Sequence, residues 1–331
     1  MGSFFKRIAP AIALFFLSPL IAEFLLGDFP LSKIGILLIL APFYGGGAIL
    51  IREIVRRTGR GWPTILLLAL AYGIFEEAFT TETLFNPDYL GLHLHLLDHA
   101  FLPALGISVW WTIFVLTLHT VWSISVPIAI VEACVPARAR IPWLKGLGLA
   151  VVLVLFLLVA VMMTVRAIQS DAHHFMASNV QFGASGVCCI AIAIAAFLLP
   201  RRKHGAAAGN PPSAWITGAL ALAACSIFLV VPSTWGWGTV AIYAALDALM
   251  IGAASSWSRR EGWNGLHTLS LAGGAALAYA WHAFIQQPVT GKADASMRIG
   301  NAVLTLATVL LLWFAGRRTA AAQPVGALAQ R

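Results

Sequence analysis

The chain of 331 residues carries a formal net charge of +8 at pH 7, but only 10% of its residues are charged and 60% are hydrophobic. Its mean hydropathy of +0.86 lies well above that of soluble domains. This composition excludes an ordinary soluble protein. It predicts an all-α, polytopic bundle that passes several times through the cell (inner) membrane.

A bilayer core of roughly 30 Å requires about 20 apolar residues for each spanning helix. The chain divides into about ten such stretches. We expect them near residues 9–27, 34–54, 62–83, 105–132, 146–166, 179–199, 214–231, 236–256, 266–286 and 299–316.

The distribution of basic residues tests this division, because Lys and Arg collect in the cytoplasmic loops. If both termini are cytoplasmic, only four of the 21 basic residues lie outside: Lys33, Arg166, Lys292 and Arg298. We therefore predict about ten transmembrane helices with cytoplasmic N and C termini. Because the basic residues are dispersed over every inner loop, they indicate contact with membrane lipid rather than with nucleic acid.

Residues 1–331 are interpreted as a single membrane domain. A six-helix part, residues 1–200, precedes the segment RRKHGAAAGNPPS at 201–213. Its glycine, alanine and proline content predicts a flexible cytoplasmic linker. A four-helix part, residues 214–331, follows.

The first apolar stretch follows Lys6 and Arg7, as a signal sequence does. It also contains Glu23 and has no convincing cleavage site of small residues. We therefore expect it to be retained as the first helix.

The third stretch ends in GIFEEAFTTETLFNP, residues 73–87. At 1.5 Å per residue, Glu76 lies roughly 21 Å from the inner boundary. Helical spacing places Glu76, Glu77, Thr80 and Thr81 on one polar stripe, which must face protein or water rather than lipid. Two adjacent carboxylates in a low dielectric cannot both ionise cheaply, and such a pair can supply an acid and a base together. The alternative is a packing role, with each glutamate protonated or bonded to a neighbouring helix.

The outer loop after this stretch contains His93, His95 and His99. If the loop were helical, His95 and His99 would share a face and could bind a metal. Polar residues in an exposed loop need no such explanation, so this site is the weaker hypothesis.

Two later stretches add intramembrane histidines. His119 lies in the fourth stretch with Trp122 and Ser123 close to it, and His282 lies in the ninth, four residues before Gln286. By helical rise, the glutamate pair and both histidines lie at depths similar enough to line one cavity. We predict a catalytic group of Glu76, Glu77, His119 and His282, with a carboxylate within about 6 Å of the His119 ring.

These residues resemble the pattern of the CAAX-protease and bacteriocin-processing family of intramembrane glutamic endopeptidases. That pattern has a Glu-Glu pair followed by an Arg, then a Phe four residues before a His, then a His four residues before an Asn. The pair corresponds to Glu76 and Glu77, and the histidines to His119 and His282. The departures are Thr81 in place of the Arg, Val115 in place of the Phe, and Gln286 in place of the Asn.

The resemblance implies a metal-independent peptidase with a membrane-associated peptide substrate and no cofactor. Glu76 or Glu77, with His119, would activate water, while His282 and Gln286 would stabilise the oxyanion. The departures leave an inactive relative as an alternative. Catalytic zinc bound by two histidines and a glutamate is another, although no HExxH spacing supports it.

Two other classes of function stay open. In a transporter, Asp247 in the eighth stretch would lie on the substrate path, and the glycine run 45–47 would interrupt its helix. In a membrane scaffold, the buried polar groups would only specify helix packing.

Overall fold

The computed structural model describes residues 2–170, 174–200, 208–289 and 292–322. Eight helical stretches within these ranges are long and apolar enough to cross a membrane. Two further helices, Ala214–Val230 and Gly265–His282, occupy the remaining positions at which the sequence predicts spans. The multi-pass helical architecture is therefore confirmed, whereas ten as the number of membrane crossings stays a prediction.

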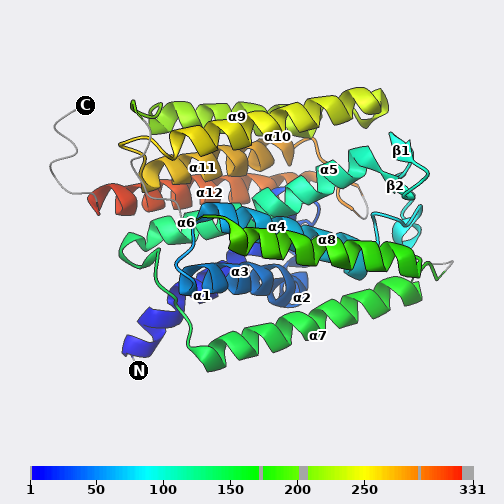
Figure 1. Cartoon of the computed structure of the whole chain (residues 1–331), viewed down its shortest axis with the longest axis horizontal. Helices are drawn as coiled ribbons and strands as arrows, with labels where there is room; N and C mark the ends of the chain where they lie inside the picture. The colour runs from blue at the N-terminus through cyan, green and yellow to red at the C-terminus, as the bar shows by residue number, and fades with distance from the viewer. Residues whose placement is uncertain (1, 171–173, 201–207, 290–291, 323–331) are drawn as a thin grey trace.

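The helices lie side by side along the long axis of the molecule (Figure 1). The α-helices are α1 (Gly2–Pro19), α2 (Leu37–Leu40), α3 (Gly46–Arg57), α4 (Trp62–Phe75), α5 (Val109–Leu118), α6 (Val126–Cys134), α7 (Gly146–Ser170), α8 (Asn179–Leu198), α9 (Ala214–Val230), α10 (Trp237–Trp257), α11 (Gly265–His282) and α12 (Ala295–Ala321). Two short strands, β1 (Phe101–Leu102) and β2 (Ile107–Ser108), form an antiparallel hairpin in the loop before α5.

Four of the long stretches contain a π-helical segment. Leu20–Leu25 continues α1, Ala41–Gly45 joins α2 to α3, Glu76–Thr80 continues α4, and His119–Ser125 joins α5 to α6. A π-helical turn holds one residue more than an α-helical turn, which changes the direction of the side chains that follow it. These segments carry the polar groups described below.

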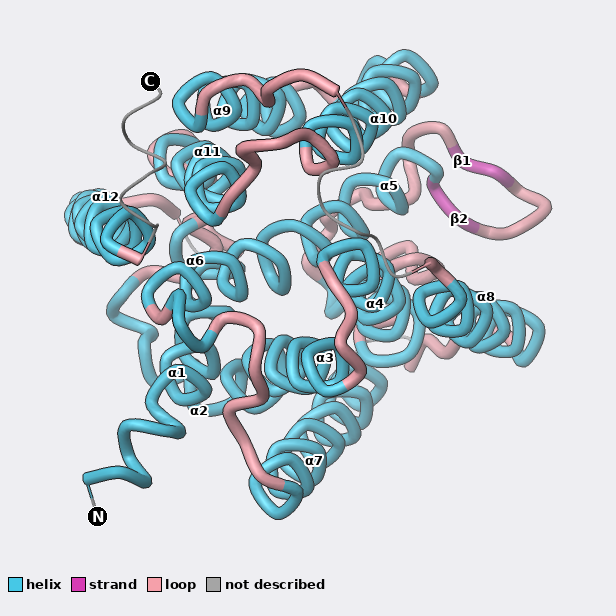
Figure 2. The backbone as a smooth tube through the Cα atoms, turned by 60° about the vertical axis from the view of Figure 1, so that its left-hand side comes forward, coloured by secondary structure: helices cyan, strands magenta, loops and turns pink. Residues whose placement is uncertain are grey.

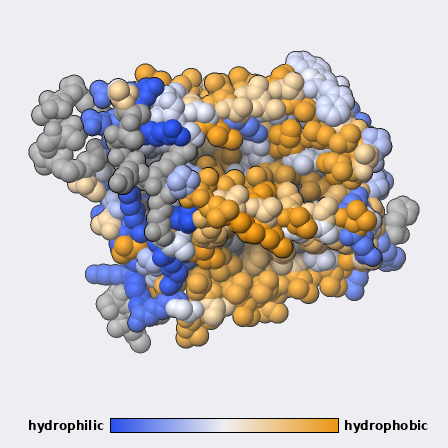
Figure 3. All heavy atoms as spheres, in the orientation of Figure 1, coloured by the Kyte–Doolittle hydropathy of each residue, from blue (hydrophilic) through white to orange (hydrophobic). Residues whose placement is uncertain are grey.

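An inner group of helices is covered by peripheral helices that face lipid. Within an apolar window of 18 residues, 56% of the stretch Val109–Cys134 is buried, against 6% for α7 and 11% each for α8 and α10. Figure 2 shows α7, α8 and α10 at the periphery, around α4, α6 and α11. The exposed apolar side chains of the peripheral helices form a broad hydrophobic band (Figure 3), as expected of a surface in contact with lipid.

The beginning of α1 and the end of α12 lie at the same end of the bundle (Figure 1). Arg138 donates hydrogen bonds to the carbonyls of Lys6 and Arg7, and Thr319 donates one to the carbonyl of Ala133. Hydrophilic residues gather at this end (Figure 3). Their basic character supports a cytoplasmic location, and the orientation of the chain in the membrane stays a prediction.

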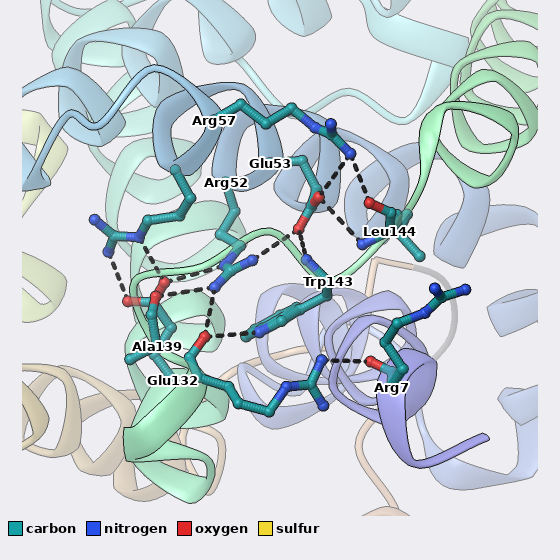
Figure 4. Close-up of polar contacts among 10 residues, drawn as sticks. Arg7, Arg52, Glu53, Arg57, Glu132, Ala139, Trp143 and Leu144 are labelled. Atoms are coloured by element: carbon teal, nitrogen blue, oxygen red, sulfur yellow. Dashed lines mark hydrogen bonds and ion pairs between the residues drawn. The ribbon is translucent and has the colours of Figure 1, made fainter. Parts of the chain in front are cut away.

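Buried ion pairs join the helices at this end (Figure 4). Arg52 on α3 pairs with Glu53 at 2.7 Å and with Glu132 of α6 at 3.1 Å, and Arg56 pairs with Glu132 at 2.6 Å. Glu53 also accepts hydrogen bonds from the backbone N–H groups of Trp143 and Leu144, just before α7. The network therefore ties three helices together at the end of the bundle away from the glutamate pair.

The two parts of the chain that the sequence distinguishes share one apolar core. Trp122 in the six-helix part stacks on Tyr279 of α11 with ring centroids 4.3 Å apart, and its indole N–H donates to the carbonyl of Ala275 at 2.8 Å. Residues 201–207 of the expected linker lie outside the described residues. The division at 201–213 therefore stays a prediction.

The glycine run 45–47 does not break its helix, contrary to the expectation attached to the transporter alternative. Gly45 ends the π-helical segment, and Gly46 and Gly47 begin α3 without an interruption. The glycines instead permit close packing: a Cβ on Gly45 would lie 2.0 Å from the carbonyl oxygen of Phe15 on α1.

Candidate functional site

The two glutamates and His119 meet where two π-helical segments face each other. Nε2 of His119 lies 2.8 Å from Oε1 of Glu77 and is hydrogen-bonded to it. Nδ1 lies 3.1 Å from Oγ of Ser123, to which it is hydrogen-bonded, and 3.1 Å from Oε2 of Glu76, at an angle unsuited to a hydrogen bond. Both distances to the carboxylates are well inside the 6 Å that the sequence argument required.

The local sequence explains why these helices can approach so closely. Gly73 faces the fourth stretch, where a Cβ would lie 3.2 Å from Cβ of His119 and 3.3 Å from a methyl group of Leu116. A larger residue at position 73 would push the two helices apart. The glutamates follow three and four residues later, so they point toward the same neighbour.

The Glu77 carboxylate is held by hydroxyl groups as well as by His119. Thr81 donates a hydrogen bond to Oε2 at 3.2 Å, and Thr83 donates another to the same oxygen. The indole N–H of Trp111 in turn donates to the Thr83 hydroxyl at 3.1 Å. Thr81, which stands where the resemblance requires an arginine, thus orients this carboxylate without adding a positive charge.

Three further polar residues, which sequence reasoning did not assign to the site, complete the cluster. The Tyr44 hydroxyl lies within hydrogen-bonding range of the carboxylates of Glu23 and Glu76, and the Tyr44 ring stacks on the His119 ring with centroids 6.0 Å apart. The Tyr72 hydroxyl is directed at Glu76 but makes no hydrogen bond of good geometry among the described residues. Glu23, an acid inside an apolar stretch, is the residue from which the sequence could have indicated that the cluster reaches the first helix.

The cluster is buried and rich in negative groups. Glu76, Glu77 and His119 are 1%, 4% and 6% exposed. In the described part of the chain, the only ion pairs of the two glutamates are with His119. Because no lysine or arginine compensates them, the cluster can stay buried only by retaining protons or by binding a cation.

An apolar cavity of about 530 Å³ lies beside the cluster, between α4, α5, α8 and the β-hairpin. Ile74, Leu84 and Leu116 line it on the side of the glutamate pair. The backbone N–H of Leu84 donates to the carbonyl of Glu77 at 3.2 Å, and Leu116 contacts Gly73. The cavity therefore adjoins neighbours of the glutamate pair, although Glu76, Glu77 and His119 do not themselves line it.

His282 does not join the cluster, and the expectation that it would was wrong. It ends α11, where its Nδ1 is buried without a hydrogen-bond partner among the described residues, and no described contact links it to Glu76, Glu77 or His119. Its depth suggested a shared site, but depth does not fix the face of the helix. The residues of α11 that contact Trp122 of the fourth stretch are Tyr279 and Ala275 instead.

Gln286 is likewise separate from the histidines. Its amide donates to Oδ1 of Asp28 at 2.9 Å, and the Asp28 carbonyl accepts a hydrogen bond from the N–H of Val289. Gln286 therefore fixes the loop after α11 to the turn that follows Glu23. A role in oxyanion stabilisation is not supported by this position.

Replacing Asp28 with asparagine is expected to make the protein more stable at alkaline pH. Burial, and then the charge of Glu23, raise the pKa of Asp28 from 3.8 to about 8, against the lowering effect of Gln286. The native state thus keeps a proton that the unfolded chain loses near pH 4, so this carboxyl destabilises the native protein increasingly between about pH 4 and 8.

Melting temperatures in detergent at pH 4 and pH 8 test the effect of Asp28. The Asp28→Asn variant should melt above the parent protein at pH 8, and the two should melt together at pH 4. A difference of the same size at both pH values would contradict the assignment.

The remaining supporting residues fall into separate places. Asp247 on α10 accepts a hydrogen bond from Thr117 at 3.1 Å, outside the cluster. Trp122 is a packing residue between the fourth stretch and α11, as its stacking on Tyr279 shows. The Thr80 hydroxyl is buried next to the glutamates and has no hydrogen-bond partner among the described residues.

The three outer-loop histidines do not form a metal site. His93 pairs with Asp88 at 3.2 Å and His95 with Asp98 at 2.9 Å, while the ring of His99 packs edge-on against Trp110. The loop is not helical here, so His95 and His99 do not share a helical face. Within the described residues, the only group of three or more metal-ligating side chains is Glu76, Glu77 and His119.

Comparison with known proteins identifies one family. The model of an uncharacterized membrane protein family matches residues 12–318. This assignment overturns the resemblance to the CAAX-protease and bacteriocin-processing family, which rested on a few residues of three helices. No curated protein and no solved structure matches the chain.

Proposed function

Because the chain belongs to an uncharacterized membrane protein family, the family brings no activity with it, and we propose from the site alone that the protein is a membrane-embedded hydrolase. The proposed reaction is the cleavage of a peptide bond in a membrane-associated substrate. The observation that carries this proposal is the 2.8 Å hydrogen bond between Nε2 of His119 and Glu77, with Glu76 on the other side of the same ring.

A carboxylate bonded to an imidazole can accept the proton of an attacking water and pass it to the leaving group. In the proposed reaction, water adds to the carbonyl carbon, its proton moves to the Glu77–His119 pair, and the leaving amine receives that proton as the C–N bond breaks. The pair is well ordered for this task because Thr81 and Thr83 hold Glu77 while Ser123 holds the second ring nitrogen of His119. The buried Tyr72 hydroxyl supplies a donor for the developing oxyanion.

The cavity beside the pair supports a substrate that resides in the membrane. Its lining is mostly apolar, and its polar side chains, which include Thr112, Ser178 and Gln181, come from the outer ends of α5 and α8. An apolar peptide segment fits such a lining better than a soluble polar compound does.

The test is cleavage of apolar peptides by the purified protein in liposomes made with H₂¹⁸O. Mass spectrometry should find one ¹⁸O atom in the new carboxyl group, which identifies hydrolysis. Glu77→Gln and His119→Gln should reduce the rate by about 10²–10⁴-fold, the usual contribution of general acid–base catalysis.

The matched control is Asp247→Asn, which removes an intramembrane acid outside the cluster and should retain the full rate. Cleavage that survives the Glu77→Gln change, or the absence of ¹⁸O incorporation in a panel that covers aliphatic and aromatic cleavage sites, would overturn the proposal.

A second candidate function, proton-coupled transport, is favoured by a chain of polar groups that leads from the cluster to the outer loops. Tyr44 connects Glu76 with Glu23, and the Asp28 carboxyl lies near enough to Glu23 to be affected by its charge. Carboxylates and hydroxyls in series are typical of proton paths. A proton flux into pH-sensitive liposomes that Glu23→Gln abolishes, without peptide cleavage, would select this function over hydrolysis.

A further inference from the structure

Among the described residues, His119 is the only basic side chain paired with Glu76 and Glu77, and two polar atoms at this site have no hydrogen bond. Oε2 of Glu76 is buried without a hydrogen bond, and so is the hydroxyl of Tyr72, which is directed at the same carboxylate. The Tyr72 side chain is only 6% exposed. Unsatisfied polar atoms in a membrane interior are costly, so their presence around one point indicates a missing partner.

The geometry of the three ligating residues suits a metal ion. One ligand atom from each of Glu76, Glu77 and His119 lies within 4.8 Å of the other two. In a tetrahedral site with bonds of about 2.1 Å, two ligands of one ion lie about 3.4 Å apart. A contraction of about 1.4 Å therefore brings all three onto a single ion.

The His119 ring is already oriented as in a metal site. A ligating histidine uses one nitrogen for the metal, and its other nitrogen is held by a hydrogen bond to the surrounding protein. Here Nε2 faces Glu77, while Nδ1 is bonded to Ser123. Ser123 thus acts as a positioning residue that holds Nδ1, so that Nε2 can exchange its hydrogen bond to Glu77 for a bond to the ion.

We propose that Glu76, Glu77 and His119 bind one divalent transition-metal ion, of the class of Zn²⁺ or Mn²⁺, inside the membrane. Two carboxylates and one imidazole match the ligand preferences of these ions better than those of Cu⁺, which prefers sulfur. The charge of the ion balances the two carboxylates, and its open position holds a water. A catalytic role of that water rests on the proposed hydrolase. In that reaction a metal-bound hydroxide would attack the substrate carbonyl, and the Tyr72 hydroxyl would face the site.

The binding test uses the full-length protein in detergent, stripped with a chelator and then dialysed against Zn²⁺ or Mn²⁺. Elemental analysis should find about one ion per chain, and the ion should raise the melting temperature. Glu76→Gln, Glu77→Gln and His119→Gln should each lose the ion, whereas Asp247→Asn should retain it. Ser123→Ala should bind the ion about 10–100-fold more weakly, which a purely structural role of Ser123 does not predict.

Several outcomes would separate this proposal from the proposed function. Because the ligand variants could misfold, each is checked by its helical circular dichroism and gel-filtration elution, and Co²⁺ substitution gives a second measure. The visible spectrum of the Co²⁺ protein should change on loss of the His119 nitrogen. A parent protein that binds no more ion than Glu77→Gln overturns the metal site. Peptide cleavage by the metal-free protein overturns the catalytic use of the metal-bound water alone, and a bound ion without cleavage overturns the hydrolase alone.

Discussion

Replacement of Arg52 by methionine is expected to lower the free energy of unfolding by about 3–5 kcal/mol, the usual effect of breaking a buried ion pair. The Arg52 side chain is fully buried and pairs with Glu53 and Glu132. Its guanidinium also donates to the carbonyls of Arg138 and Ala139, and it lies 3.4 Å from the centre of the Trp143 ring. Methionine fills a similar volume, so the loss reflects the uncompensated carboxylates and carbonyls rather than a cavity.

The matched control for Arg52 is Arg57→Met on the same helix. The Arg57 side chain is 36% exposed and lies 3.5 Å from the other oxygen of Glu53. Arg57 also donates to the Leu144 carbonyl at 2.6 Å. Because its guanidinium is open to water, the pair is screened and should contribute only about 0–1 kcal/mol, so this variant should lose much less stability than Arg52→Met. The free energy of unfolding of each variant is measured by titration with SDS in mixed micelles, with circular dichroism as the signal. Equal effects of the two substitutions would contradict the role assigned to the buried network.

Replacement of Gly45 by alanine is expected to cost about 3 kcal/mol, near the upper end for overpacking of a well-filled core. The added Cβ would lie 2.0 Å from the carbonyl oxygen of Phe15 and 2.6 Å from its carbonyl carbon. Both contacts are with backbone, so no side-chain rotation can relieve them. The helix α1 must move away, and the Tyr44 ring next to position 45 moves with it.

Gly35→Ala is the matched control for Gly45. No heavy atom lies within 4 Å of the position of a Cβ on Gly35, and its backbone does not adopt a positive φ. Alanine there should leave the free energy of unfolding unchanged or raise it by about 0.4–1 kcal/mol, because alanine lowers the conformational entropy of the unfolded chain. The same SDS titration applies. A Gly45→Ala variant as stable as Gly35→Ala would show that α1 and the π-helical segment Ala41–Gly45 are not packed as closely as the structure has them.

The pairing of Glu76 and Glu77 with His119 could be predicted because two simple rules were sufficient. Helical rise placed the residues at comparable depths, and helical periodicity placed the glutamates on one polar face. A polar face inside a membrane must turn toward protein, and the only strong candidates nearby were the intramembrane histidines. The same rules failed for His282, since depth alone does not show which neighbour a helix face meets.

Glu23, Tyr44 and Tyr72 could not be assigned to the site from the sequence. They lie on three stretches whose order around the bundle is not encoded in hydropathy. Tyr72 approaches α3 because Gly47 leaves room for its ring, where a Cβ would lie 2.6 Å from Cε2. Such a contact depends on the pairing of two helices, so it has no local signature.

The sequence by itself determined that the chain is a multi-pass helical membrane protein and that a few acids and histidines must be buried in it. Apolar length and period are properties of consecutive residues, so hydropathy and helical geometry are enough to derive them. The tertiary structure alone decided that Glu23, Tyr44 and Tyr72 join the predicted group of Glu76, Glu77 and His119, and that His282 does not. Four π-helical segments rotate Glu23, Tyr44, Glu76, Glu77 and His119 toward one point, and the insertion of a π-helical turn is fixed by packing between helices rather than by the residues of one helix.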